Sequence, residues 1–186
     1  YSLGENLGKI TLIIGHLWQG GGERVCTTLA NEFVKLGYEV EVVVFSLEKA
    51  IFDKELNKSI KLTNLEIRSN KQVFPKLVKY FQKNKTETIV SFNFHISFFL
   101  SLLKPFFGFK LISRSLNTLS EEIKGKNSFL DKFKVKLLAY GLRKSDLVIA
   151  QSEGMKKDLN KFSIKKIEVI NNPINPKYLN IQEDKK

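Results

Sequence analysis

The sequence predicts a single doubly wound α/β domain, in which one mostly parallel sheet carries helices on both faces. Short runs rich in β-branched residues alternate with stretches whose apolar residues recur at helical spacing. The first such unit is a strand, a glycine turn, a helix and a second strand, a βαβ crossover that requires parallel pairing. The length of 186 residues suits one domain.

The first βαβ unit is the clearest part of the pattern. Lys9–Gly15 is a β-branched, apolar run that ends in glycine, as expected of a strand buried on both faces. From Glu23 onward the apolar residues fall on one face of a helix, at Val25, Leu29, Phe33 and Leu36. Gly37 stands where a helix C-cap is expected. Val40–Ser46 is then the second strand.

The alternation continues to the end of the domain. Further strands are predicted at Ile60–Arg68, Thr88–Asn93, Lys110–Ser115, Leu147–Gln151 and Lys166–Ile170. Helices are predicted between them at Pro75–Lys83, Ser97–Leu103, Ser128–Arg143 and Glu153–Lys161, and Pro105 is expected to end the second of these. Two prolines follow Ile170, so the segment after it is predicted to form neither a helix nor a strand. We therefore expect a leader at 1–8, the domain at 9–172 and a linker at 173–186.

The formal charge of +12 is concentrated in the middle of the chain. Lys71 to Lys144 holds 15 Lys and Arg against 4 Asp and Glu. Such a block favours an anionic partner, namely membrane phospholipid, nucleic acid or a phosphorylated substrate, although a face of solvated lysines has the same composition. Cys26 is the single cysteine, which excludes an intramolecular disulfide and suits a reducing compartment. No apolar run reaches the length of about 18 residues that a membrane-spanning helix needs.

Candidate ligand-binding segments follow from the predicted sheet, because ligands of open α/β sheets bind beyond the carboxyl ends of the strands. That rule selects His16–Glu23, Ser46–Leu47, Asn93–His95, Arg114–Asn117 and Gln151–Gly154.

Three glycines, Gly20, Gly21 and Gly22, directly precede the first helix. Backbone N–H groups and the helix dipole favour a phosphate there, although three glycines also suit a plain tight turn. The spacing fits neither G-x-x-x-x-G-K-[ST] nor G-x-G-x-x-G. No acidic residue ends the second strand to hold a ribose, so a nicotinamide cofactor is disfavoured.

Five segments resemble, in order, those of the retaining GT-B enzymes known as glycosyltransferase family 4. They are HLWQGGGERVCTTLANEFVKLGYEVEVVVF, TIVSFNFH, LISRSLN, SDLVIAQSEGMKKDL and KIEVINNPIN. The first is similar to that family's Gly-Gly loop, Glu-Arg pair and first helix, and the last to its exit strand toward a second domain. The resemblance covers residues 9–176. It implies a Rossmann-like N-terminal half of a GT-B fold, the acceptor-side half of an enzyme that transfers sugar with retention to a cell-surface glycan or lipid-linked acceptor.

The resemblance also implies roles for individual residues. The family's glycine loop lies against the donor diphosphate, which corresponds to Gly20–Gly22 here. Some members have a histidine after the fourth strand that approaches the transferred sugar. Either Asn93 or His95 fills that position, although a histidine beside four phenylalanines also suits a structural role. Arg114 and Asn117 are expected to contact acceptor or donor, since an arginine can hold a phosphate with two hydrogen bonds, with a surface loop contact as the alternative. Catalytic residues remain unidentified.

The family's nucleotide-binding residues belong to its second domain. We therefore expect no cofactor and no metal in this chain, and a sugar nucleotide as the donor of the full-length enzyme. The expected partners are that sugar nucleotide and a glycan or lipid-linked acceptor, with no nucleic acid, because no reader motif is present. The expected location is cytoplasmic. Two alternatives stay open: a sugar-nucleotide 2-epimerase of the same architecture, and a non-enzymatic basic module that binds membrane or nucleic acid.

A membrane contact is a further expectation. Family members that build lipid-linked glycans sit on the inner membrane face through basic and apolar surface of this domain. The candidates here are Phe98–Lys110 and Lys124–Lys144, where Lys132, Lys134 and Lys136 run beside helically spaced aromatic residues. Basic amphipathic helices lie in anionic interfaces. A helix that simply covers the sheet and solvates its lysines gives the same pattern.

Overall fold

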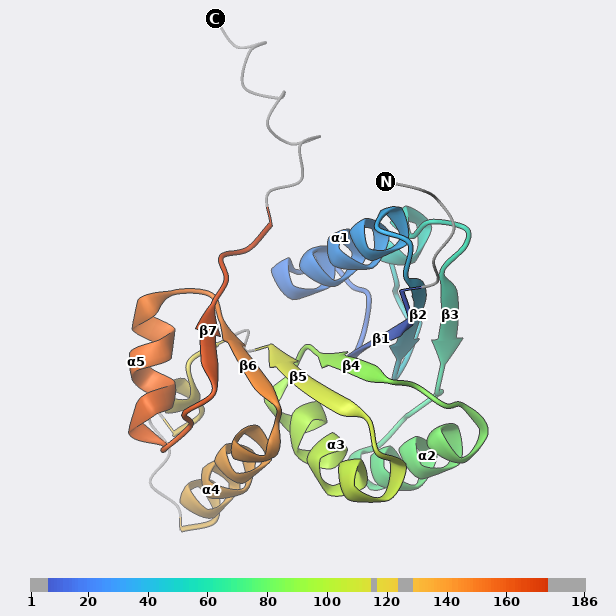
Figure 1. The fold of residues 1–186 in the computed structure, drawn as a ribbon. Helices are drawn as coiled ribbons and strands as arrows, with labels where there is room; N and C mark the ends of the chain where they lie inside the picture. Colours follow the sequence, from blue (N-terminus) through green and yellow to red (C-terminus); the bar gives the residue numbers. More distant parts are fainter. Residues whose placement is uncertain (1–6, 115–116, 124–128, 174–186) are drawn as a thin grey trace, which may run out of the picture.

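The computed structural model of the protein describes residues 7–114, 117–123 and 129–173. Within these residues seven strands form one sheet in the order β3-β2-β1-β4-β5-β6-β7, and every neighbouring pair is parallel (Figure 1). The strands are β1 (Lys9–Ile14), β2 (Glu39–Val44), β3 (Lys61–Asn64), β4 (Thr88–Ser91), β5 (Lys110–Arg114), β6 (Leu147–Ala150) and β7 (Ile167–Val169). The predicted doubly wound, Rossmann-like sheet is confirmed, with strands shorter than predicted.

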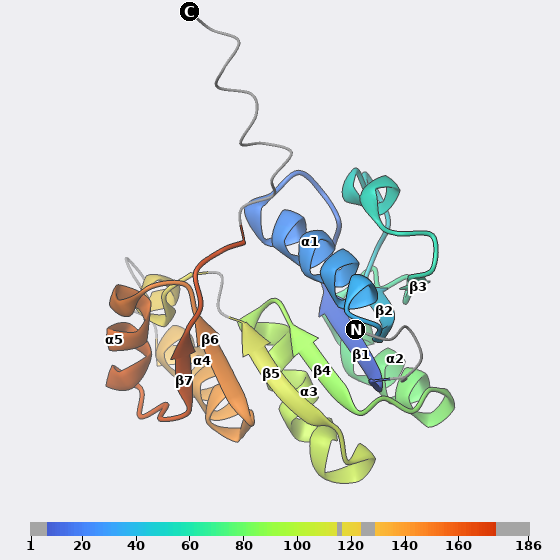
Figure 2. The ribbon, with the colours of Figure 1, turned by 45° about the horizontal axis from the view of Figure 1, so that its top comes forward.

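Helices cover both faces of this sheet. They are α1 (Gly21–Lys35), α2 (Asn70–Lys83), α3 (Phe94–Phe107), α4 (Phe129–Lys144) and α5 (Glu153–Lys161), with short 3₁₀ helices η1 (Phe52–Glu55) and η2 (Leu119–Ile123). Helix α1 lies over one face, α2, α3 and α4 lie under the other, and α5 lies beside β6 and β7 (Figures 1 and 2). No helix in the described part of the chain has both the length and the apolar character needed to cross a membrane.

Two helices extend beyond their predicted bounds because prolines proved weaker boundaries than expected. Helix α2 begins at Asn70 rather than Pro75, since Val73 in its extra turn is buried against the sheet. The prediction that Pro105 ends α3 is wrong: Pro105 lies in the last turn. Gly108 ends the helix instead, at φ 71°, a left-handed conformation that favours glycine, and its N–H donates to the Lys104 carbonyl.

The core lies on both faces of the central strands, as the apolar runs predicted. Successive side chains of a strand point to opposite faces, so Leu12 and Val42 pack beneath α1, whereas Ile13 and Val43 pack against α2 and α3. All four are fully buried. This two-sided burial explains why β1 and β2 have continuous rather than alternating apolar sequences.

One buried carboxylate interrupts the core near the amino ends of the strands. Glu41 lies in β2, and its side chain is within 2.8 Å of Lys9 Nζ and 3.1 Å of Lys61 Nζ. The Thr63 hydroxyl donates to it at 2.7 Å. Burial alone raises the pKa of Glu41, but hydrogen bonds from Lys9, Thr63 and Lys61 outweigh it and leave that pKa below its ordinary value. The carboxylate thereby joins β1, β2 and β3.

The described residues include only part of the predicted leader and of the predicted linker. Of the leader, Gly8 accepts a hydrogen bond from the Glu39 N–H at the start of β2. Residues 1–6 and 174–186, which hold the rest of the leader and nearly all of the predicted linker, lie outside the described residues.

Candidate functional site

The predicted site segments gather at the carboxyl edge of the sheet. The chain winds from β1 toward β2 and β3 on one side, and from β4 toward β7 on the other, so the order reverses between β1 and β4. That reversal is where open α/β sheets form a ligand crevice. Register places Ile13 beside Ser91 and Ser91 beside Ser113, so β1, β4 and β5 end next to one another. The segments after these three strands therefore converge.

The three glycines form the start of α1 at this edge. Gly20 is the N-cap, with extended backbone, and within the described residues no side chain caps it. A Cβ built on Gly21 meets no atom within 4 Å, so the space above the first turn is open. The Glu23 carboxylate folds back against Gly20, where a Cβ would overlap it. An anion is favoured at a helix N-terminus, and a bound phosphate would take the place of this carboxylate.

Hydrogen bonds tie the loop between β1 and α1 to the segment that follows β2. The Gly15 carbonyl accepts from Phe45 N–H at 3.0 Å, and the Leu17 carbonyl accepts from Ile51 N–H at 2.8 Å. The Leu17 side chain is fully buried in the core beneath α1. The glycines are thus presented by an anchored loop.

Asn93 and His95 start α3 directly after β4. Asn93, predicted to end a strand, is instead the exposed N-cap of α3. Its Oδ1 accepts from the His95 N–H at 2.8 Å and lies 3.0 Å from His95 Nδ1. The structure therefore brings both residues to the predicted edge and gives Asn93 a helix-capping role. Their contact with a sugar stays a prediction.

Arg114 ends β5 and is buried, with 2% of its surface exposed. Nη2 donates to Oδ1 of Asn172 at 2.5 Å, which ties the end of β5 to the segment that follows β7. Within the described residues Nε has no partner. Burial lowers the pKa of the guanidinium. Asn117 is exposed, three residues beyond β5. Contacts of Arg114 and Asn117 with acceptor or donor stay predictions.

A row of buried serines supports this edge from below, and sequence reasoning missed it. Ser91 lies 2.6 Å from Ser97 and 3.4 Å from Ser113, and Ser113 lies 2.7 Å from Ser145, all between hydroxyl oxygens. Ser97 also donates to the Asn93 carbonyl at 3.0 Å. The row fixes the start of α3 to β4 and β5. Isolated serines spread over the sequence carry no signal that could have revealed it.

An aromatic pair lies two residues before the glycines, inside the predicted segment His16–Glu23, but neither of its members was assigned a role from the sequence. The rings of His16 and Trp18 stack with centroids 4.1 Å apart and planes inclined by 15°. The Trp18 Nε1 donates to the Glu48 carbonyl. The preference for tryptophan at binding surfaces was the available signal.

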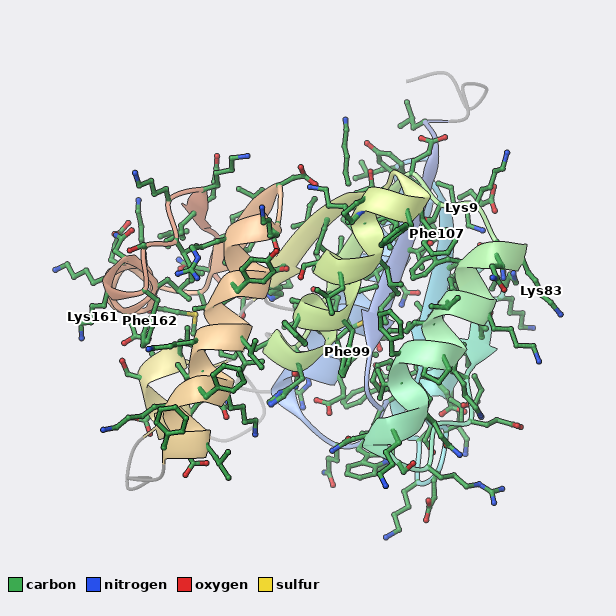
Figure 3. The ribbon with its side chains drawn as sticks, turned by 90° about the horizontal axis from the view of Figure 1, so that it is seen from below. Lys9, Lys83, Phe99, Phe107, Lys161 and Phe162 are labelled. Carbon is green, nitrogen blue, oxygen red and sulfur yellow. The ribbon has the colours of Figure 1, made fainter. Side chains whose placement is uncertain are left out.

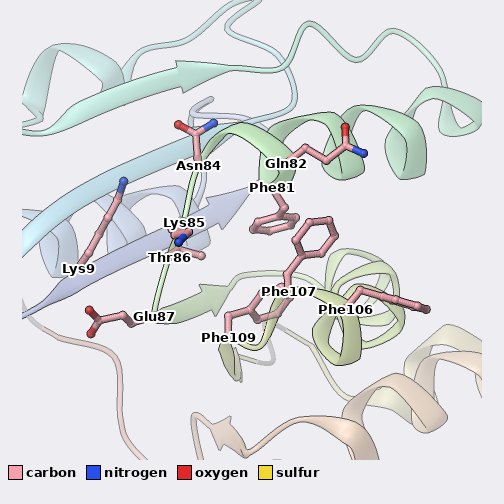
Figure 4. A pocket seen from close by; sticks show the side chains of 10 residues that line it. All are labelled: Lys9, Phe81, Gln82, Asn84, Lys85, Thr86, Glu87, Phe106, Phe107 and Phe109. Carbon is pink, nitrogen blue, oxygen red and sulfur yellow. The ribbon is translucent and has the colours of Figure 1, made fainter.

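A cavity of about 750 Å³ lies at the opposite, amino edge of the sheet. Figure 4 shows Phe81 and Phe107 facing one another in it, with Phe109 below and Phe106 directed away. Lys9, which also lines it, is paired with Glu41. Because the strand ends at this edge are amino ends, we do not assign the cavity to the candidate site.

The predicted membrane-facing lysines lie on α4, in the layer seen from below in Figure 3. Lys132, Lys134 and Lys136 are exposed. Phe129, which begins the helix, is 81% exposed, and Phe133 is also exposed. The described residues contain no group of three His, Cys, Asp or Glu side chains that could hold a metal ion.

Comparison with known proteins identifies relatives of the whole arrangement. Residues 19–178 match the family described as Glycosyltransferase Family 4. The comparison with curated proteins gave no match. Among solved structures, the fold is similar to Anabaena HepE in complex with UDP-glucose, with a TM-score of 0.71 and 18% identity over 90% of this chain and 44% of that one.

Two further solved structures share the fold. The lipopolysaccharide outer core galactosyltransferase WaaB gives a TM-score of 0.66 at 16% identity, over 90% of this chain and 46% of that one. An epimerase from Listeria monocytogenes, described as a UDP-N-acetylglucosamine 2-epimerase, gives 0.59 at 15% identity, over 86% and 43%. The chain therefore spans less than half the length of these proteins.

Proposed function

Because the chain belongs to Glycosyltransferase Family 4, we propose that it is the acceptor-side half of an enzyme that transfers a sugar from a sugar nucleotide. The observation that carries the proposal is the uncapped, glycine-lined start of α1 at the point where the strand order reverses. This is where an α/β sheet binds a phosphorylated ligand. UDP and UDP-glucose complexes of HepE, a protein of the same fold, support a nucleotide sugar as the donor.

The donor is held between two halves in this proposal. The chain covers 44% of HepE and 46% of WaaB, so a second domain of similar size supplies the nucleotide-binding residues. The donor diphosphate is bound by the N–H groups of Gly20, Gly21 and Gly22. The Glu23 side chain moves away from Gly20 when the diphosphate binds. Asn93, His95 and Asn117 contact acceptor or transferred sugar. Arg114 is 2% exposed and bonded to Asn172, so it reaches either ligand only by giving up that bond. No cofactor or metal takes part through this half.

The proposed chemistry is transfer with retention of configuration at the sugar carbon. The bond between that carbon and the diphosphate oxygen breaks, and the acceptor hydroxyl oxygen forms a new bond to the same carbon on the same face. Negative charge develops on the leaving diphosphate, which takes up the acceptor proton. Backbone N–H groups and the positive end of α1 stabilise that charge without moving, which is electrostatic rather than base catalysis.

The proposed acceptor is a cell-surface glycan or a lipid-linked oligosaccharide at the cytoplasmic face of the membrane. Its support is the similarity to WaaB together with the exposed lysines and aromatic residues of α4. Basic helices with an exposed apolar side lie in anionic interfaces. These observations support an anionic lipid surface, rather than nucleic acid, as a partner.

The second candidate function is a sugar-nucleotide 2-epimerase, favoured by the similarity to the Listeria epimerase. Product analysis of the intact protein separates the two. Incubated with a radiolabelled sugar nucleotide and a membrane extract, a transferase moves label into glycan or lipid and releases nucleoside diphosphate. An epimerase converts the sugar nucleotide into its epimer and labels no acceptor, which would overturn the transferase proposal.

A further inference from the structure

Trp18 is the only tryptophan in the chain, and its side chain is exposed although contacts hold it in place. Its surface is 41% exposed, although tryptophan is usually well buried. It lies on the loop between β1 and α1, two residues before Gly20 and beyond the carboxyl end of β1. The tryptophan therefore belongs to the edge of the sheet where the proposed transfer takes place.

Contacts on two sides hold the indole in one orientation. One face stacks on the His16 ring, with centroids 4.1 Å apart. The ring N–H donates to the Glu48 carbonyl in the loop after β2. Leu17, between the two rings in sequence, is fully buried and bonded through its carbonyl to Ile51. A side chain held in this way loses little freedom when it binds a ligand.

These contacts leave part of the indole accessible. His16 covers one face and the Glu48 carbonyl meets the N–H edge, while 41% of the Trp18 surface stays exposed. The exposed part is assigned to the face opposite His16, the largest surface outside these two contacts. Aromatic faces carry negative partial charge and attract C–H groups with positive partial charge. A pyranose ring presents C–H groups of this kind on one face, where its axial C–H bonds point the same way. Its hydroxyl groups are directed outward around the rim.

Polar groups next to the indole in sequence or contact suit those hydroxyls. Glu48, whose carbonyl accepts from the indole N–H, is exposed, and its carboxylate can accept hydrogen bonds from sugar hydroxyls. Gln19, also exposed and next in sequence, offers an amide that both donates and accepts.

We propose that Trp18, held by His16 and Glu48, is a stacking platform for a pyranose ring of the acceptor. This rests on the proposed transferase function and specifies it, because it makes the acceptor a saccharide that meets this half of the enzyme at the β1–α1 loop. Trp18 binds the acceptor, and His16 acts as a positioning residue beneath it.

Saturation-transfer NMR on the chain with methyl β-glucopyranoside, methyl β-galactopyranoside and, separately, UDP tests the platform. We expect the sugar C–H protons to receive saturation from the protein. Trp18→Ala should weaken saccharide binding about tenfold, which is the effect of losing one aromatic contact. Trp18→Phe keeps a smaller aromatic face and loses the bond to Glu48. Its affinity for the saccharide should therefore lie between those of the wild type and Trp18→Ala. His16→Ala should weaken binding while the tryptophan emission shifts as the indole becomes mobile.

Phe106→Ala is the matched control, since Phe106 is 81% exposed and lies at the amino edge. It should leave saccharide binding unchanged. Absence of saccharide saturation in the wild type, or its persistence in folded Trp18→Ala, would overturn the platform. Saturation of UDP that depends on Trp18 would overturn it in favour of a nucleotide contact. The transferase proposal is judged separately, by product analysis of the intact protein, where Trp18→Ala should raise the acceptor KM and leave the donor KM unchanged.

Discussion

At the scale of single residues, Gly21 is where chemistry and stability separate most cleanly. A Cβ on Gly21 meets open space, so the fold accommodates a side chain there. In the proposed function, the donor phosphate approaches the backbone of α1 through the same space. Gly21→Val in the intact enzyme should therefore cut turnover by more than about tenfold while the melting temperature changes by only a few degrees.

Thermal melts and initial rates on the same preparations provide the measurement. Gly21→Ala, with one methyl group, should show a smaller loss of rate. An equal loss of stability and rate in the valine variant would instead indicate that the glycines serve only to form a tight turn.

Glu41 carries the pH dependence that we expect of folding. Its pKa is lowered in the folded state because hydrogen bonds from Lys9, Thr63 and Lys61 outweigh burial. The carboxylate therefore stabilises the fold above the ordinary glutamate pKa of about 4.3, and this stabilisation is lost as the pH falls through the lower folded-state pKa. Glu41→Gln should cost about 2 kcal/mol of unfolding free energy at neutral pH, the scale of a charge-assisted hydrogen bond.

Urea unfolding of the wild type and of Glu41→Gln, at pH values from neutral to acid, measures this loss of stability. The difference in unfolding free energy should narrow toward acid pH, where Glu41 is protonated in the wild type. A difference that is constant with pH would show that the ionised form contributes nothing.

At the scale of elements, the crossing of α3 and α4 depends on a close backbone approach at Gly141. A Cβ on Gly141 would lie 2.7 Å from Phe98 Cα and 3.1 Å from its backbone nitrogen. Backbone atoms cannot move aside as a flexible side chain can. Gly141→Ala should therefore destabilise the fold by about 1–3 kcal/mol, although alanine is the better helix former.

Gly154→Ala is the control within a helix, because its Cβ would make an ordinary contact of 3.7 Å with Ser152 Oγ. Chemical denaturation should show it to be neutral or slightly stabilising. A neutral Gly141→Ala would mean that the two helices slide apart at little cost.

The outer surface of α4 carries the membrane prediction. Val135, Leu138 and Leu142 are buried, whereas Lys132, Lys134 and Lys136 are exposed. If this surface meets a membrane, the chain should sediment with anionic liposomes and not with neutral ones, and salt should weaken binding. Replacing the three lysines by Gln should release it, since each is worth about 1 kcal/mol near such a surface.

Three exposed lysines outside the basic block, Lys54, Lys58 and Lys157, provide a control of equal charge change. Their replacement by Gln should leave sedimentation largely intact. Equal sedimentation with both liposome types would identify the lysines of α4 as a solvated surface and remove the support for a lipid-linked acceptor.

At the scale of the whole molecule, the described residues form one seven-stranded sheet, whereas the proposed transfer needs a second domain. Seven parallel strands with a core on both faces should allow the isolated 186-residue chain to fold cooperatively. It should not transfer sugar, because donor binding needs a second domain in our proposal. Circular dichroism melts together with release of UDP from UDP-glucose test both parts. Sustained turnover by this chain alone would contradict the division into two halves.

The sequence by itself determined the sheet and the edge that carries the candidate site. Apolar periodicity is a local property, so the seven strands, the crossovers between them and the first glycine turn were predictable from short windows. Because the carboxyl ends of parallel strands share one edge, the convergence of the Gly20, Asn93 and Arg114 segments was predictable as well.

Tertiary contacts decided the rest, because they join residues that no local window compares. Burial of Val73 extends α2 ahead of Pro75, and the packing of α3 carries it past Pro105. Arg114 is directed to Asn172, 58 residues away, instead of toward solvent. Trp18 is held partly by Glu48, in a loop that follows a different strand. A periodic pattern predicts which face of its element a residue occupies. The residue's contact partner on that face depends on how distant segments pack.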